Sequence, residues 1–132
     1  MNESLFERRK ISTSFPPNVT AKWSVEVLDE GFVPFPKRLL RSLPKVFKGE
    51  HVAEDLAVVL AIVDFRRPNL TRGPSIDFLA FNSGLTKELF LARVKNLEKR
   101  GLVKRDGASD EAVSFDLTGL EEAIQKYTPE EG

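Results

Sequence analysis

The most regular pattern of hydrophobic and polar positions lies in residues 79–103, LAFNSGLTKELFLARVKNLEKRGLV. Phe90, Val94 and Leu97 recur at intervals of three and four residues, which predicts a helix with one buried stripe. Thr86 stands just before this stripe and is a favourable N-cap, because its hydroxyl oxygen can accept a hydrogen bond from the first turn. The segment therefore predicts a helix, a tight turn, a second helix and a strand.

Glycines mark the ends of both predicted helices. Gly84 ends the first helix and Gly101 closes the second, since glycine adopts the left-handed conformation at little steric cost. Leu102 lies where the hydrophobic contact of a Schellman motif meets Leu97. Ala80 is small enough to let a neighbouring helix approach closely. We therefore expect two helices that meet across a short turn.

A β-hairpin is predicted directly after the second helix. Residues 102–105 form its first strand, residues 106–107 begin the turn, and residues 112–117 form the returning strand. Val113 and Phe115 alternate with polar residues in the returning strand, so both are expected to point inward.

Two more helices are predicted on the N-terminal side of this segment. Residues 56–65 are apolar almost all round and predict the central helix of the core. Glu54 and Asp55 fall in its first turn, where carboxylates favour the positive end of the helix dipole. Residues 76–82 predict the next helix, with Ser75 as its N-cap.

A short basic helix is predicted to open at Pro36, with Leu39, Leu40 and Leu43 as its apolar side. Pro44 is expected to bend or end it. This segment carries five cations and no acid: Lys37, Arg38, Arg41, Lys45 and Lys48. Such a charge pattern fits a solvated helix face and a phosphate-contacting surface equally well.

The N-terminal part of the chain reads as a loose arm followed by a strand. Residues 1–20 are polar, with a basic run and two prolines, and either reach along DNA or have no role. Trp23, Val25 and Val27 alternate with polar residues and predict a strand, which residues 29–31 end in a turn.

The C-terminal part predicts one amphipathic helix. Thr118 and Glu121 have the spacing of a capping box. One apolar face is formed by Leu117, Leu120, Ile124 and Tyr127. This face either packs back on the domain or forms a dimer seam. The predicted organisation is an arm over residues 1–20, one domain over residues 21–128 and an acidic tail over residues 129–132.

The composition limits the chemistry that the chain can perform. It has 132 residues, 41% of them hydrophobic, no cysteine and a single histidine, His51. Thiolate metal sites, disulfides and histidine-linked triads are therefore not predicted, and the scattered glycines form no phosphate-binding loop. The sequence predicts no enzyme activity, cofactor, metal or small-molecule ligand. Without an apolar run long enough for a signal or membrane segment, a cytoplasmic protein is expected.

The order of helix, turn, helix and hairpin in residues 79–117 resembles the winged helix-turn-helix of DNA-binding domains. The resemblance implies an α+β, mainly α fold with a three-helix core, a hairpin wing, an extra N-terminal strand or hairpin and a C-terminal helix. Residues 32–40 and 56–103 are also similar to the N-terminal domains of phage and bacterial replication-initiation proteins. This resemblance implies a role in transcription regulation or in DNA replication.

In such a fold the helix over residues 86–100 lies in the major groove of duplex DNA. Thr86, Lys87 and Glu88 are expected near base edges, with Lys95 and Lys99 on phosphates. Leu91 either meets thymine methyl groups or docks on another protein. At the base of the wing, the cations expected to reach the adjacent backbone or minor groove are Lys104 and Arg105.

The charge distribution leaves two functions open. The chain is neutral overall, yet residues 84–105 hold seven basic and two acidic residues, and residues 106–132 hold one basic and eight acidic. The basic segment favours DNA binding, with a possible homodimer, while the acidic wing tip favours a winged-helix module that binds protein instead.

Overall fold

We describe the protein from a computed structural model, which defines residues 17, 21–24, 26–65, 73–106 and 109–127. The chain divides into two compact units, Met1–Val33 and Pro34–Gly132, and each is described by itself. Most of the predicted arm over residues 1–20, the residue Val25, the predicted turn residue Gly107 and the acidic tail lie outside the described residues.

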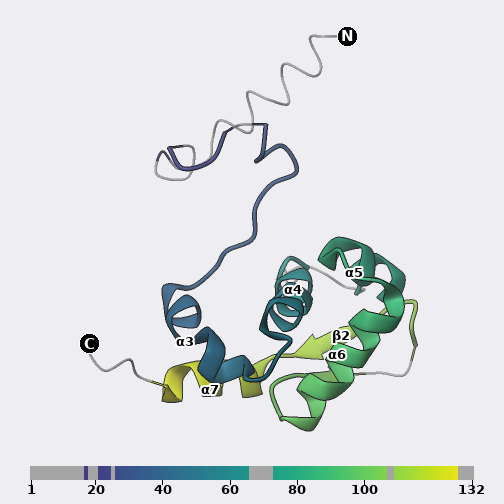
Figure 1. The fold of residues 1–132 in the computed structure, drawn as a ribbon. Coiled ribbons are helices and arrows are strands. Elements are labelled where there is room, and N and C mark those ends of the chain that lie inside the picture. The colour runs from purple at the N-terminus through teal and green to yellow at the C-terminus, as the bar shows by residue number, and fades with distance from the viewer. Residues whose placement is uncertain (1–16, 18–20, 25, 66–72, 107–108, 128–132) are drawn as a thin grey trace. The chain divides into compact units, whose positions relative to one another are not determined.

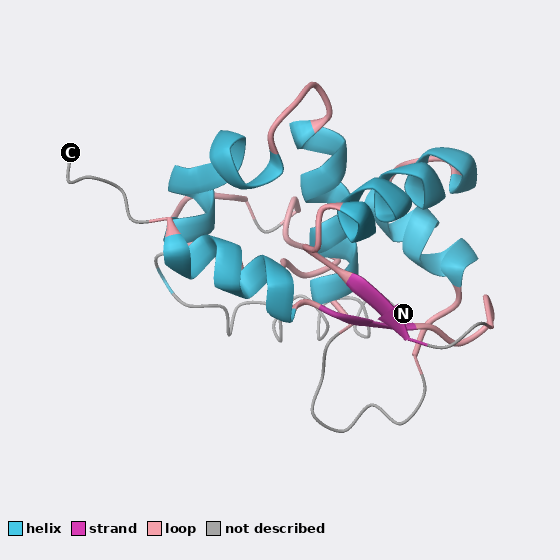
Figure 2. Ribbon diagram, turned by 90° about the horizontal axis from the view of Figure 1, so that it is seen from below, coloured by secondary structure: helices cyan, strands magenta, loops and turns pink. Residues whose placement is uncertain are grey.

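The C-terminal unit is α+β and mainly helical, as predicted (Figure 1). Its elements, in chain order, are α3 (Lys37–Phe47), α4 (Val52–Val63), α5 (Ile76–Ser83), α6 (Lys87–Lys99), β1 (Lys104–Asp106), β2 (Ser114–Asp116) and α7 (Thr118–Lys126). β1 and β2 pair antiparallel, with Arg105 opposite Phe115 (Figure 2). The predicted hairpin is therefore confirmed, although both strands are shorter than expected.

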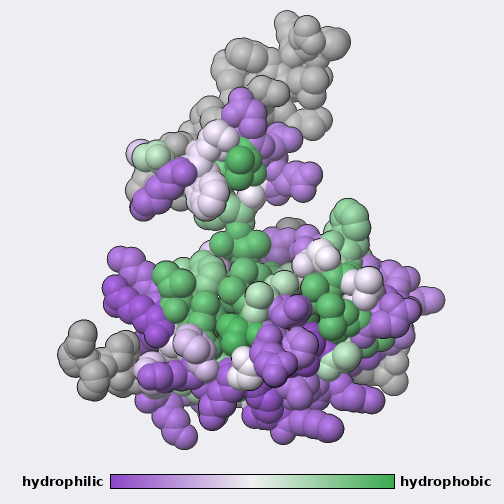
Figure 3. All heavy atoms as spheres, in the orientation of Figure 1, coloured by the Kyte–Doolittle hydropathy of each residue, from purple (hydrophilic) through white to green (hydrophobic). Residues whose placement is uncertain are grey.

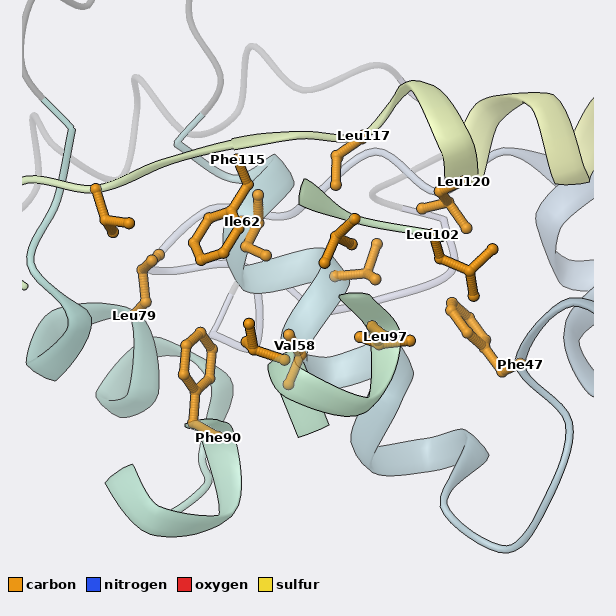
Figure 4. Packing of buried hydrophobic residues seen from close by; sticks show 14 of the residues in the cluster. Phe47, Val58, Ile62, Leu79, Phe90, Leu97, Leu102, Phe115, Leu117 and Leu120 are labelled. Carbon is orange, nitrogen blue, oxygen red and sulfur yellow. The ribbon is translucent and has the colours of Figure 1, made fainter. Parts of the chain in front are cut away.

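The apolar helix α4 is central to the core, as its sequence predicts. It packs against α3, α5 and α6, and α7 packs against α3. Phe90 and Leu97 from α6, Phe47 from α3 and Phe115 from β2 are buried together with side chains of α4 (Figure 4). The C-terminal helix thus packs back on the unit, and its apolar face covers the core through Leu120 and its neighbours.

The helix ends in the α5–α6 segment follow the predicted local chemistry. Gly84 and Gly101 both adopt left-handed backbone conformations, with φ of 79° and 75°. At each glycine two backbone hydrogen bonds close a Schellman motif, for example from Leu102 N to Leu97 O at 3.0 Å. Thr86 and Ser75 act as N-caps, because their side-chain oxygens accept from backbone N–H groups three residues later.

The basic helix α3 differs from its prediction. It continues through Pro44 to Phe47, and Leu40 is 58% exposed. Pro44 removes the hydrogen bond that would reach the carbonyl of Leu40, but both residues lie on the exposed side, where water can hydrate that carbonyl. The helix is retained because Val46 and Phe47 beyond the proline are buried.

Two further predictions about local structure are wrong. Residues 21–24 and 26–30 form turns rather than a strand, with Ser24 O accepting from Val27 N at 3.1 Å. The described part of that unit offers no second strand to pair with, so the alternating residues gain nothing by extending. The capping box at Thr118 is also wrong, since Thr118 already lies inside α7 and Asp116 Oδ1 accepts from its N–H at 2.9 Å.

Candidate nucleic-acid interface

The outer face of α6 carries four of the eight side chains that the sequence assigns to DNA: Lys87, Glu88, Lys95 and Lys99. Helices α4 and α5 cover the opposite face of α6, whereas α7 lies against α3 (Figure 1). Mainly hydrophilic residues lie over α6 and α7 in the space-filling view (Figure 3). The exposed members of the predicted site are Thr86, Lys87, Glu88, Lys95, Lys99 and Lys104, and the half-buried members are Leu91 and Arg105.

The start of α6 is fixed by hydrogen bonds and one ion pair. Thr86 Oγ1 accepts from Leu89 N at 3.1 Å, so this hydroxyl retains its proton and one lone pair for a ligand. Lys87 Nζ lies 3.2 Å from Asp77 Oδ1 of α5, and both side chains are exposed. An exposed pair of this kind contributes about 0–1 kcal/mol, so a phosphate or base can displace Asp77 from Lys87.

Leu91 is not the exposed residue that the sequence predicts. It is half-buried and packs against the core, one residue after the fully buried Phe90. The buried stripe of α6 is therefore wider than the spacing of Phe90 and Val94 indicates, because residues beside a stripe still cover core surface. Leu91 belongs to the packing of α6 rather than to its outer face.

Arg105 is held by the hairpin to which it belongs. Its guanidinium Nη2 donates to Asp110 Oδ1 at 2.5 Å and to Ser109 O at 3.2 Å. The hydrogen bond from Arg105 lowers the pKa of Asp110 below its ordinary value. The backbone N–H of Arg105 also donates to Glu98 Oε2 of α6, at 3.0 Å. Arg105 thus joins the hairpin to the end of α6 and is only partly available to a ligand.

Three lysines of the predicted site are exposed on α6 or at the start of β1, and we call them the α6 lysine row: Lys95, Lys99 and Lys104. All three are exposed, and no carboxylate among the described residues lies within 4.0 Å of their amino groups. Lys95 and Lys99 are four residues apart and therefore share one side of α6. This row is the part of the predicted site that is exposed and not engaged in ion pairs with the described chain.

A buried ion-pair network lies behind α6, and the sequence analysis missed it. Asp55 of α4 is fully buried and accepts from Arg93 Nε at 2.7 Å and Arg93 Nη2 at 3.2 Å. Arg100 Nη1 lies 3.5 Å from Asp55 Oδ2, the oxygen that also accepts from Arg93 Nη2. The hydrogen bonds to Asp55 raise the pKa of Arg93 above its ordinary value, against the opposing effect of burial.

Arg100 extends this network to the end of α3. Its Nη2 donates to Val46 O at 3.0 Å and also to Phe47 O. The two arginines were counted in the basic charge of residues 84–105, yet both face the interior. Their positions carry a signal for this, because Arg93 follows Phe90 by three residues and Arg100 follows Leu97 by three, so each lies beside the buried stripe.

The single histidine does not belong to a metal-binding cluster of described residues. His51 is exposed just before α4, with Nδ1 3.8 Å from Glu54 Oε1. In the described part of the chain, no cluster of three or more His, Cys, Asp or Glu side chains could hold a metal ion. Across the same residues, no helix combines the length and apolarity needed to cross a membrane.

No protein-family model, curated protein or solved structure matches this chain. Inference about function therefore rests on the geometry and charge of its own residues.

Proposed function

We propose that this protein binds duplex DNA as a winged-helix domain, with α6 in the major groove. The order of α4, α5, α6 and the β1–β2 hairpin is the order such a domain requires. The short turn between α5 and α6 is fixed by the Schellman motif at Gly84 and the N-cap Thr86, which supports a rigid presentation of α6.

The observation that carries this proposal is the exposed α6 lysine row, of which Lys95 and Lys99 lie on one side of α6. Long cations on one side of a helix reach the phosphates that flank a groove. Thr86, Lys87 and Glu88 at the start of α6 are then placed for base edges, with lysine suited to guanine and glutamate to cytosine N4. Lys104 at the start of β1 extends the same contact to the neighbouring backbone.

The proposed biological role is that of a transcriptional regulator or a replication-initiation factor. Both roles use the same contact between a helix and a groove, so the fold alone supports them equally. Enrichment of binding sites from a random duplex library, followed by comparison with promoter and origin sequences, would separate them.

A salt titration with a short duplex tests the proposed contact. The variant Lys95→Gln/Lys99→Gln/Lys104→Gln removes three cations from the row. If each contacts one phosphate, the slope of log Kobs against log salt becomes less steep by about 2.7, at about 0.9 per phosphate. Fluorescence anisotropy of a labelled duplex between low and moderate salt measures this slope.

A charge-matched control comes from the exposed start of α3, with the variant Lys37→Gln/Arg38→Gln/Arg41→Gln. It changes the net charge by the same amount and should leave the slope close to that of the parent protein. If both variants flatten the slope equally, attraction to DNA is not directed by α6. If the parent protein shows no binding at low salt, the proposal is wrong.

A second function, as a protein-interaction module, is favoured by one observation on α5. Phe78 and Phe81 are 44% and 77% exposed, with ring centroids 6.0 Å apart, and Phe65 meets the edge of Phe78 at 5.1 Å. Exposed aromatic clusters are typical of protein contacts. Sedimentation of the parent and of Phe81→Ser with a candidate partner, or alone for a homodimer, would test this function.

A further inference from the structure

A hollow of about 800 Å³ lies between the end of α3, the end of α6 and α7. We call it the α3–α7 hollow. Its charged lining consists of four cations and a single carboxylate: Lys45, Lys48, Arg100, Lys126 and Glu122. The lining also includes Tyr127, Gly101 and Gly119. This lining is unusual for a neutral chain, because it concentrates positive charge in a concave surface.

The end of a helix normally disfavours an anion, because the last carbonyl groups carry partial negative charge. At the end of α3 this charge is already satisfied. Arg100 donates to Val46 O and Phe47 O, and Asp55 balances the charge of Arg100 from the interior. Arg100 therefore offsets part of the negative charge at the C-terminal end of α3. The three remaining lysines share the hollow with one carboxylate, Glu122.

Those lysines are Lys45, Lys48 and Lys126, and no described carboxylate lies within 4.0 Å of their amino groups. Lys45 Nζ lies over the ring of Tyr127, 5.1 Å from its centroid. Tyr127 raises the pKa of Lys45 above its ordinary value, through hydrogen bonding first and charge interaction second. The ammonium group of Lys45 is therefore both positioned and charged.

Lys48 has the only positive φ among the described non-glycine residues, with φ 47° and ψ 156°. Its N–H donates to Pro44 O at 3.1 Å, which holds this conformation at the end of α3. Such a conformation costs a residue with a side chain of order 1–3 kcal/mol and is often found at functional sites. In this conformation Lys48 lines the hollow.

One wall of the hollow is tightly packed where α7 meets the turn after α6. Gly119 of α7 lies against the backbone of Gly101, where an added Cβ would come within 1.9 Å of the Gly101 carbonyl oxygen. Only glycine fits this approach between α7 and the turn after α6. The close contact holds the helix that carries Lys126 in place and therefore fixes one wall of the hollow.

We propose that the α3–α7 hollow binds a phosphate group through Lys45, Lys48 and Lys126. A phosphate accepts hydrogen bonds from several ammonium groups at once, and its charge matches a site with three lysines and one carboxylate. The hollow has room for more than a phosphate ion, so an ester whose remainder lies against Tyr127 fits the site. The site is separate from the α6 lysine row and does not depend on the proposed binding of DNA by α6.

The first test is a titration of the full chain with inorganic phosphate at constant ionic strength, followed by NMR of backbone amides. We expect saturable shifts that include Lys48, Gly119 and Tyr127. The variant Lys45→Gln/Lys48→Gln/Lys126→Gln should raise the Kd for phosphate at least tenfold. The matched control Lys95→Gln/Lys99→Gln/Lys104→Gln should leave the Kd within twofold of the parent value.

Three results would overturn the proposal. One is a response that does not saturate, or that chloride reproduces at the same ionic strength. Another is equal weakening in both variants, and a third is a set of shifts confined to α6 and the hairpin. Circular dichroism of each variant establishes that the fold is kept. Loss of DNA binding in the α6 variant alone leaves the proposal untouched, so the two proposals can fail separately.

Two probes then identify the source of the phosphate group. If a short duplex competes with inorganic phosphate and the hollow variant flattens the salt dependence of duplex binding, the phosphate belongs to a nucleic-acid backbone. If adenosine monophosphate competes and the duplex does not, the hollow takes a small phosphorylated molecule. If neither competes, the hollow does not accept phosphate esters, and the proposal is wrong.

Discussion

Helices α6 and α3 both carry several basic residues, and both pack against α4, but they use their cations differently. In α6 the guanidinium of Arg93 faces inward to Asp55, and Lys87 is paired with Asp77. In α3 the basic side chains are exposed, and none is within 4.0 Å of a described carboxylate. Two helices with the same number of basic residues therefore present different numbers of unpaired cations to a ligand.

The comparison shows that the surface charge of a helix can be counted from its sequence only when its buried residues are known. A cation beside the stripe can reach a buried carboxylate, as Arg93 does, and then contributes to packing instead of to the surface. A cation opposite the stripe stays in solvent, where it can meet phosphates. By this criterion the α6 lysine row and the α3 cations contribute to the exposed positive charge of the molecule, whereas Arg93 does not.

The strongest way to test this comparison is to remove the carboxylate on which the inward-facing arginines depend. The substitution Asp55→Asn leaves Arg93 and Arg100 without a compensating charge inside the molecule. Breaking a buried ion pair from one side costs about 3–5 kcal/mol, so we expect a loss of this size in the free energy of unfolding. Urea denaturation followed by circular dichroism measures it.

Glu54→Gln is the matched control for this prediction, because Glu54 is the neighbouring carboxylate in the first turn of α4 and is only half-buried. We expect less than about 0.5 kcal/mol from this substitution, as for most surface changes. A loss below about 1 kcal/mol for Asp55→Asn would show that Arg93 and Arg100 find water or other partners. The division between structural and surface cations would then be wrong for α6.

Local chemistry made much of this fold predictable. The ends of α5 and α6 depend on a left-handed glycine and on a hydroxyl cap, and both act within a few residues. The stripe of Phe90, Val94 and Leu97 is likewise a property of one helix, and all three are buried. The positions of Thr86 and Gly84 could therefore be read from the sequence.

The rest depends on contacts between distant segments, which a single sequence does not encode visibly. Asp55 and Arg93 are 38 residues apart in the sequence. The sequence alone therefore could not distinguish a buried Asp55 from a solvent-exposed acid in the first turn of a helix. Pro44 is tolerated because Phe47, further along, is buried by other helices. The α3–α7 hollow could not be predicted either, since its lysines come from helices more than 70 residues apart.

A smaller change in stability is expected at Lys48, the residue that follows the C-terminal end of α3. Lys48→Gly should raise the free energy of unfolding by about 0.5–1 kcal/mol, because glycine adopts a positive φ without strain and only part of that gain is offset by unfolded-state entropy. The same variant loses a cation of the hollow and should bind inorganic phosphate more weakly. Chemical denaturation and the NMR titration measure the two effects on one sample.

Lys48→Gln still places a side chain at a positive φ, so it keeps the strain but removes the charge. It is therefore the control for this pair of effects. We expect its stability to match that of the parent protein, while its affinity for phosphate falls as in Lys48→Gly. At the end of α6, Gly101 already holds the left-handed position, so no comparable gain exists there. A destabilised Lys48→Gly variant would mean that the side chain contributes more packing than the strain costs.

The smallest expected effect is the pH dependence of stability that arises from the ion pair between Arg105 and Asp110 in the hairpin beside α6. Because Arg105 lowers the pKa of Asp110 below its ordinary value of 3.8, the folded state binds this proton less readily than the unfolded state. The stabilisation is therefore fully present above the unfolded pKa and disappears as the pH falls through the lower, folded pKa. The parent protein should have a slightly higher free energy of unfolding than Asp110→Asn at higher pH, and this difference should disappear only in that acidic range.

NMR titration of the Asp110 carboxyl carbon measures the midpoint directly, and Arg105→Gln should return it toward 3.8. Binding of duplex DNA offers a second readout, because a phosphate that recruits Arg105 must compete with Asp110. In the bound state the midpoint for Asp110 would then rise, since the carboxylate has lost its partner. A midpoint unchanged by saturating DNA would exclude Arg105 from the interface and leave the α6 lysine row as its charged part.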